Sequence, residues 1–269
     1  MSLLQTIILS IIEGLTEFLP ISSTGHMVLG ATFMGIEKEA FTKVFIECVQ
    51  FGTILSVVVL YWRKFFDFSR WKLYVKLVIA FIPAAIIGII FKKHIDAALG
   101  NPVFIASVMF AGGIILLFVD QWFTKPTIDN DTKITYKKSL FIGCFQVLSI
   151  LFPGLSRSAA TIIGGMQQKL TRKAAAEFSF FLAVPTLAGA FAKSLWDAWF
   201  ETPELFQNHH NIIMLIVGNV IGFIVAMLAI KGFINYLTKH GFKVFGWYRI
   251  AVGGLIIILL LCGVNLTFH

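Results

Sequence analysis

Residues 13–26 read EGLTEFLPISSTGH, and this stretch decides how the rest of the chain is interpreted. Glu13 and Glu17 stand in a largely apolar run, and their i,i+4 spacing would place both carboxylates on one face of a helix. Pro20 is expected to end that helix, because it lacks an N–H and disfavours helical geometry at the preceding residue. A polar loop follows, and apolar residues then resume. This order predicts a re-entrant helical hairpin in a membrane protein, with acids, hydroxyls and an imidazole at its tip.

The composition of the chain favours a membrane location. Its 269 residues are 58% hydrophobic and 13% charged, whereas a soluble domain is about 25% charged. Such a chain cannot cover a water-facing surface, which excludes an ordinary soluble protein. The formal net charge of +8 is therefore attributed to loops that set the topology in the bilayer, and no nucleic acid partner is expected.

Six further apolar segments have about the ~20 residues needed to cross a bilayer. They are expected at residues 44–62, 73–91, 103–123, 174–200, 212–230 and 247–266. A polar stretch at residues 124–138 reads as a connector. The predicted fold is an all-α integral membrane protein, in which residues 1–269 form a single membrane domain.

The two halves of the chain, at about residues 1–123 and 139–269, follow the same plan. An alignment on the two prolines pairs Glu13 with Gln146, Pro20 with Pro153, Ser23 with Ser156, and Thr53 with Thr186. Each half would hold one re-entrant hairpin and three spans, so the second copy must insert upside down. This is an inverted-topology repeat, a class that places its sites where the repeats meet near mid-membrane.

Lysine and arginine residues predict the orientation. Most of the 22 fall in loops on one side of the predicted membrane: Arg63, Lys64, Arg70, Lys72, Lys76, Lys125, Lys133, Lys137, Lys138, Lys169, Arg172, Lys173, Lys231, Lys239, Lys243 and Arg249. The positive-inside rule makes this side cytoplasmic and puts both termini outside. The first hairpin then opens at the outer face.

Charged side chains within the apolar segments mark a candidate site, since charges in a bilayer are costly and usually functional. The repulsion between the adjacent carboxylates of Glu13 and Glu17 would be relieved by a proton, a basic partner or a divalent cation. Mg²⁺ or Ca²⁺ would suit, held by the two carboxylates together with phosphate oxygens. Arg157 follows Pro153 and Gly154, where the start of a helix would also face an anion. These residues predict phosphoryl chemistry at a membrane-embedded diphosphate.

The polar loops supply the remaining candidates. Ser23 is a candidate nucleophile, with His26 as its base or as the acid for the leaving group; alternatively, His26 activates a water beside the metal. The expected substrate-binding residues are Ser22, Thr24, Gly25, Gly154, Ser156, Ser158 and Thr161. Thr24 and Gly25 are expected mainly to shape the loop. Small hydroxyls also pack helix interfaces in membranes, so that role stays open for the others.

The motifs E-x-x-x-E, P-x-S-S-T-G-H and P-G-x-S-R-S-x-x-T occur unbroken at residues 13–17, 20–26 and 153–161. Together they resemble the bacitracin-resistance undecaprenyl-diphosphatase family, and the resemblance covers the whole chain. It implies cation-dependent hydrolysis of undecaprenyl diphosphate at the outer face of the bacterial cell membrane, which recycles the lipid carrier for peptidoglycan synthesis and cell wall biogenesis and confers bacitracin resistance. Carried over by position, it implies that Glu13, Glu17, Ser23, His26 and Arg157 are catalytic.

A second function class fits the same architecture. Inverted repeats with broken helices are typical of secondary transporters, so the chain could carry or flip a phosphorylated polyprenyl lipid. The sequence leaves open which cation is used, whether Ser23 forms a phosphoenzyme, and whether the protein is a homodimer. It also leaves open the preferred chain length of the lipid.

Overall fold

The computed structural model describes residues 1–264 and 266, and in that part of the chain the regular elements are helices, with one isolated bridge between Ile128 and Leu170. Six helices are long and apolar enough to cross a membrane. They are α3 (Ala40–Leu60), α5 (Trp71–Ile90), α7 (Pro102–Trp122), α10 (Arg172–Glu201), α12 (His209–His240) and α13 (Lys243–Leu261). The prediction of an all-α fold with six apolar helices of membrane-spanning length is therefore confirmed.

Some helices extend beyond the predicted spans, and short helices join them. The helix α12 has 32 residues and continues to His240, well past the end predicted at residue 230. It stops at Gly241, whose φ of 75° favours glycine. The short elements are α4 (Trp62–Phe65), η1 (Phe68–Arg70), α6 (Lys92–Leu99), η2 (Asp131–Lys133) and α11 (Glu204–Gln207). Hydropathy marks the stretch suited to lipid, whereas a helix can continue into polar sequence.

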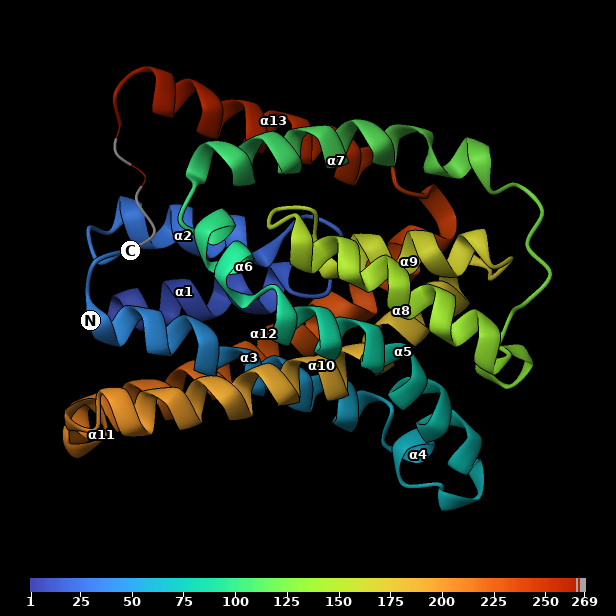
Figure 1. Cartoon of the computed structure of the whole chain (residues 1–269), viewed down its shortest axis with the longest axis horizontal. Coiled ribbons are helices and arrows are strands. Elements are labelled where there is room, and N and C mark those ends of the chain that lie inside the picture. Colours follow the sequence, from blue (N-terminus) through green and yellow to red (C-terminus); the bar gives the residue numbers. More distant parts are fainter. Residues whose placement is uncertain (265, 267–269) are drawn as a thin grey trace.

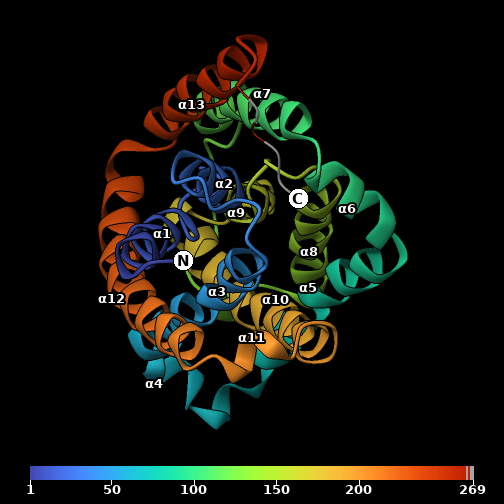
Figure 2. The same ribbon diagram turned by 90° about the vertical axis from the view of Figure 1, so that its left-hand side faces the viewer.

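Two helical hairpins lie in the centre of the molecule. One is formed by α1 (Leu3–Thr16) and α2 (Ser23–Phe33), the other by α8 (Tyr136–Leu151) and α9 (Arg157–Gln167). They enter from opposite ends of the molecule, and their tips meet between the two ends (Figure 1). Viewed from one end, α1, α2 and α9 lie inside a ring that includes α7, α10, α12 and α13 (Figure 2). The remaining helices thus enclose both tips.

The two halves of the chain are interleaved in the fold. The helix α1 packs on α12 and α8 packs on α5, so each half places its first helix against a long helix of the other half. The helices α7 and α13 pack side by side, as do α3 and α10. These exchanged contacts mean that neither half could bury its hairpin alone.

The backbone at the tips corrects the predicted register between the halves. Ser22 and Ser156 have φ of 73° and 74°, a region rare for residues other than glycine, and each directly precedes an 11-residue helix. Ser156 therefore matches Ser22, and Arg157 matches Ser23. The prolines give a register one residue away, because α8 is two residues longer than the 14-residue α1 while the loop that follows α8 is one residue shorter than the loop that follows α1.

The loops rich in lysine and arginine gather at one end of the molecule. The helix α4, the connector before α8 and the turn between α12 and α13 lie at this end, while the N-terminus and the end of α13 lie at the other (Figure 1). Asp131 of the connector accepts a hydrogen bond from Arg70 at 2.6 Å. Arg249 departs from the predicted distribution, because it is fully buried within α13 and donates to carbonyls of the hairpin tips.

Close helix crossings should make some glycines irreplaceable. A Cβ added at Gly52 of α3 would run into the backbone of Asn219 in α12, whereas a Cβ at Gly88 of α5 meets nothing within 4 Å. We expect Gly52→Ala to lower the free energy of unfolding by about 1–3 kcal/mol through overpacking. Gly88→Ala should leave it unchanged or raise it by up to about 1 kcal/mol. Thermal unfolding of both variants in detergent measures the difference. Equal stabilities would contradict the close approach of α3 and α12 at Gly52.

Candidate active site

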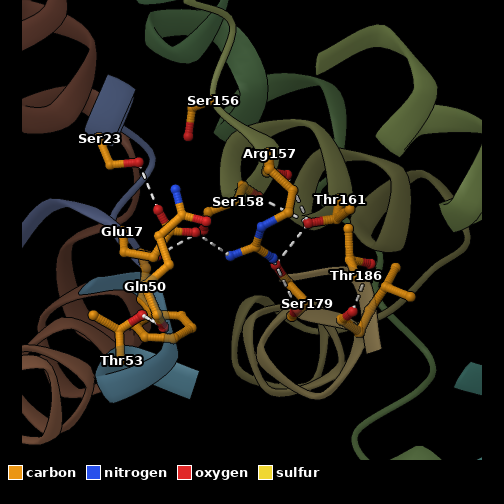
Figure 3. A network of polar contacts seen from close by, with 12 residues as sticks. Glu17, Ser23, Gln50, Thr53, Ser156, Arg157, Ser158, Thr161, Ser179 and Thr186 are labelled. Atoms are coloured by element: carbon orange, nitrogen blue, oxygen red, sulfur yellow. Dashed lines mark hydrogen bonds and ion pairs between the residues drawn. The ribbon is translucent and has the colours of Figure 1, made fainter. Parts of the chain in front are cut away.

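An ion pair joins the tips of the two hairpins. Nη2 of Arg157 lies 3.1 Å from Oε1 of Glu17, and the two side chains are only 11% and 5% exposed. The other carboxylate oxygen, Oε2, accepts a hydrogen bond of 2.5 Å from Oγ of Ser23. Nη1 of Arg157 donates to the carbonyl of Ser179 on α10 at 3.2 Å. The structure thus brings together three of the five expected catalytic residues (Figure 3).

Two helix N-termini converge on this cluster. Ser23 is the first residue of α2 and Arg157 is the first residue of α9, and both side chains contact Glu17. The unpaired N–H groups and the dipole of a helix N-terminus favour bound anions. The tips therefore present hydrogen-bond donors from two helix N-termini, and the guanidinium of Arg157 adds further donors beside Glu17.

Hydroxyl groups of α9 hold the two tips together through the backbone. Oγ of Ser158 donates to the carbonyl of Phe18 at 2.6 Å, and Oγ of Ser156 donates to the carbonyl of Leu19 at 3.5 Å. Oγ1 of Thr161 donates to the carbonyl of Arg157 at 2.9 Å. Ser158 and Thr161 are fully buried, and these bonds give both hydroxyls a structural role, one of the two roles expected for them.

Two glycines lie at positions where an added side chain would clash or fit tightly. Gly154 has a φ of +98°, and an added Cβ would run into the carbonyl of Ile105. An added Cβ at Gly25 would lie 3.3 Å from Sδ of Met109. Both positions allow the tips to approach α7 closely, which gives these glycines a role in shaping the loops.

Glu13 lies one helical turn before Glu17 and is 1% exposed. Neither of its carboxylate oxygens has a hydrogen-bond partner among the described residues. The side chain lines a cavity of about 320 Å³, which Thr24 and Gln50 also line. Charged residues of the segment between α2 and α3 lie along the same cavity: Glu37, Lys38, Glu39 and Lys43. The cavity therefore connects Glu13 with the end of the molecule that carries the N-terminus.

The residues present fit a divalent cation that arrives with a phosphorylated ligand. Glu13 offers two unpartnered oxygens, and its carboxylate is close enough to Glu17 for the two to interact. Within the described part of the chain, no group of three or more His, Cys, Asp or Glu side chains is arranged to hold a metal. The protein would thus supply one or two carboxylates, which is how Mg²⁺ is commonly bound when phosphates and water complete its shell.

The ring of His26 is engaged away from Ser23. Its Nδ1 lies 2.8 Å from the carbonyl of Ser22, and its Nε2 lies 2.8 Å from Oη of Tyr248. The rings of His26 and Tyr248 stack at 5.5 Å between centroids. A carbonyl only accepts, so Nδ1 carries the proton, and Nε2 of the neutral ring accepts from Tyr248. The expected Ser23–His26 pair is not formed, and the hydroxyl proton of Ser23 is directed to Glu17 instead.

Sequence reasoning missed three residues of this region: Ser179, Tyr248 and Arg249. Arg249 carried a usable signal, because it stands inside the span predicted at residues 247–266. A charged residue is as unusual there as Arg157 is in its own apolar segment. Tyr248 carried none, since tyrosine is common in membrane helices near the interface. Ser179 contributes its backbone carbonyl, which no side-chain pattern predicts.

The sequence is similar to curated proteins over nearly its full length. The family described as "Bacitracin resistance protein BacA" matches residues 6–255. An undecaprenyl-diphosphatase of Porphyromonas gingivalis is 51% identical over 99% of this chain and 100% of its own length. Proteins of the same name from Flavobacterium johnsoniae and Bdellovibrio bacteriovorus are 52% and 46% identical, over 97% and 99% of this chain and 96% and 99% of their own lengths. The matched range contains the tips of both hairpins and the cluster that they form.

The buried ion pair should contribute strongly to the coupling between the hairpins. We expect Arg157→Met to lower the free energy of unfolding by about 3–5 kcal/mol, because it leaves a buried carboxylate without its partner. The double variant Glu17→Gln/Arg157→Met should lose less than the sum of the single variants. Unfolding by sodium dodecyl sulfate in mixed micelles provides the measurement.

The exposed pair of Lys133 and Asp129 is the matched control for this cycle. Lys133→Met should cost no more than about 1 kcal/mol, since exposed ion pairs contribute little. If the double variant lost as much free energy of unfolding as the Glu17 and Arg157 variants together, the two residues would not be coupled across the tips.

Proposed function

The chain belongs to the bacitracin resistance protein BacA family, and on this premise we propose that it is a membrane-embedded phosphatase. Its substrate would be undecaprenyl diphosphate, and its products undecaprenyl phosphate and inorganic phosphate. The relatives named undecaprenyl-diphosphatase support this substrate through identity over almost the whole chain. The observation that carries the proposal is the contact of Glu17 with both Ser23 and Arg157, because it combines a base, a hydroxyl and an anion-binding group.

The diphosphate would bind between the two hairpin tips. Nε of Arg157 is buried and has no partner in the described part of the chain, so a donor remains for a phosphate oxygen. The first N–H groups of α2 and α9 would add further donors. Guanidinium groups bind phosphate strongly, because the hydrogen bonds are charge-assisted.

We propose that Glu13 and Glu17 hold a divalent cation, Mg²⁺ or Ca²⁺, together with the diphosphate. The cation would neutralise phosphate charge and polarise the phosphorus–oxygen bonds. If both carboxylates are ionised, they outweigh the single charge of Arg157 and disfavour a bound anion. The unpartnered oxygens of Glu13 support this assignment.

Glu17 would accept the proton of the Ser23 hydroxyl. Oγ of Ser23 would then attack the terminal phosphorus, the bond to the bridging oxygen would break, and undecaprenyl phosphate would leave. Water would next hydrolyse the phosphoserine and release phosphate. In the alternative route, Glu17 and Ser23 orient a water that attacks directly. The Ser23–Glu17 hydrogen bond of 2.5 Å favours the first route.

The site would open at the outer face of the bacterial cell membrane. The cavity beside Glu13 lies toward the end opposite the basic loops, and the positive-inside rule places those loops in the cytoplasm. We propose that the hairpins are re-entrant from opposite faces, that both termini lie outside, and that the two halves form an inverted repeat. Release of undecaprenyl phosphate there would recycle the lipid carrier for peptidoglycan synthesis and deplete the lipid target of bacitracin.

Transport of a phosphorylated polyprenyl lipid is the second candidate. Its support is the meeting of two broken helical hairpins inside an interleaved repeat, an arrangement that transporters use for alternating access. Binding alone, however, would not require the hydrogen bond between Ser23 and Glu17. A phosphatase that also returns its product lipid inward would combine both functions.

Purified protein should release phosphate from undecaprenyl diphosphate when Mg²⁺ or Ca²⁺ is present and stop when the cation is chelated. We expect Glu17→Gln and Arg157→Ala to lower kcat/KM by about 10²–10⁴-fold, since each removes a group acting on the developing charge. The exposed Glu201→Gln is the matched control and should keep full activity. Wild-type protein that binds the lipid but releases no phosphate would favour the transporter.

Ser23→Ala separates the two chemical routes. We expect a loss of at least about 10³-fold in kcat, because the hydroxyl bonded to Glu17 would be the nucleophile. Rapid acid quench of the wild type should trap phosphate on residues 22–24, detected by mass spectrometry. Activity within about tenfold of wild type in Ser23→Ala would favour a directly attacking water.

A further inference from the structure

Arg249 is a charged side chain at the centre of the molecule. It is 0% exposed and lies on α13, one residue after the Tyr248 that contacts His26. Its guanidinium makes four hydrogen bonds, all to backbone carbonyls. Nε donates to Met109 at 3.2 Å, Nη1 to Pro20 at 3.2 Å and to Leu155 at 2.7 Å, and Nη2 to Gly154 at 2.8 Å.

Three of these carbonyls belong to the non-helical tips of the two hairpins. Pro20 lies between α1 and α2, and Gly154 and Leu155 lie between α8 and α9. A carbonyl outside a helix has no intrahelical partner, and in an apolar interior it is costly when left unpaired. Arg249 supplies donors to both tips from a single planar group. Its position fixes where the two loops lie relative to each other.

The charge of Arg249 has no carboxylate partner among the described residues. In the part of the chain that the structure describes, no Asp or Glu oxygen lies within 4 Å of its nitrogens. A partner used only for charge balance would be a carboxylate, whereas four carbonyls match the geometry of a guanidinium fork. The arrangement therefore selects for the shape of the guanidinium as well as for its charge.

Glycines in the neighbouring helix α7 leave space for this side chain. A Cβ added at Gly112 of α7 would run into Nη2 of Arg249, and a Cβ at Gly113 would run into the backbone of Gly246 and Ile250. On the facing helix α13, Gly253 lies against the backbone of Phe110. These small residues let α7 and α13 approach closely and leave a slot for the guanidinium beside Gly112.

We propose that Arg249 is a positioning residue for the phosphatase reaction, holding the backbone of both hairpin tips so that Glu17, Ser23 and Arg157 meet in reacting geometry. The proposal rests on the proposed function. Pro20 lies three residues from both Glu17 and Ser23, and Leu155 lies two residues before Arg157. Movement of either tip by about 1 Å is enough to cost about 100-fold in rate.

Two glycine substitutions where α7 and α13 meet test the positioning role of Arg249 without removing its charge. Gly112→Ala displaces the guanidinium, whereas a Cβ at Gly254 makes only ordinary contact at 3.8 Å, so Gly254→Ala is the matched control. With undecaprenyl diphosphate and Mg²⁺, we expect Gly112→Ala to lower kcat by at least about tenfold while KM stays within about threefold. Gly254→Ala should keep both constants.

Substitution of Arg249 itself provides the second arm. We expect Arg249→Met to lower kcat by about 100-fold or more and Arg249→Lys to recover part of that loss, since the ammonium keeps the charge but cannot reach four carbonyls. Arg172→Met is the control, because Arg172 pairs with Asp120 away from the tips. It should reduce stability and leave kcat within about threefold.

Hydrogen exchange by mass spectrometry gives a readout that does not depend on activity. In Arg249→Lys and Gly112→Ala, exchange should rise in residues 17–25 and 152–160 and stay unchanged in the long helices. Unchanged exchange at both tips would overturn the proposal, as would loss of protection spread evenly over the fold. If wild-type protein releases no phosphate, the proposed function fails, while the exchange data still decide whether Arg249 holds the tips.

Discussion

Backbone carbonyls buried in an apolar interior must find donors, and this constraint determines how the two hairpin tips are built. Each tip breaks its helix, and the carbonyls released there have no solvent to accept from. The structure pairs them across the tips: Phe18 and Leu19 with hydroxyls of Ser158 and Ser156, and Pro20, Gly154 and Leu155 with the guanidinium of Arg249. Because these bonds join one hairpin to the other or to α13, satisfying the backbone also brings Glu17 and Arg157 into contact.

The same region leaves some side-chain groups unsatisfied, in contrast to its backbone. Both oxygens of Glu13 and Nε of Arg157 are buried and lack partners among the described residues. An unpaired buried polar group costs about 1–3 kcal/mol, and more when charged. A carboxylate without partners and a guanidinium with one free donor match a ligand that carries both charges, as a diphosphate with its cation does. The stability given up at these atoms is therefore consistent with a binding site.

Hydropathy and intramembrane charges predicted the six spans and placed Glu17, Ser23 and Arg157 in one site. What the patterns did not predict depended on geometry. The register of the repeat shifts by one at the tips, because α8 is two residues longer than α1 and the loop after α8 is one residue shorter, so Ser156 matches Ser22. Ser158 and Thr161 point into the protein, where their hydroxyls donate to the carbonyls of Phe18 and Arg157. His26 was expected to act with Ser23 or with a water beside the metal, and its imidazole contacts Tyr248 on α13.

The corrected register gives a reason why two similar hairpins form one site. Ser23 and Arg157 occupy equivalent positions, each the first residue of an 11-residue helix, and both reach Glu17. Counted from the helix starts, Gln146 in α8 occupies the position of Glu13 in α1, and its amide bonds to Thr186 at 3.2 Å. Glu13 has no such partner among the described residues, and the hydroxyl of Thr53, which the sequence alignment pairs with Thr186, donates to the carbonyl of Gln50. One copy thus keeps a satisfied amide where the other keeps a free carboxylate. With both acids on the first hairpin and the arginine on the second, the proposed cation and diphosphate would be held where the two tips meet.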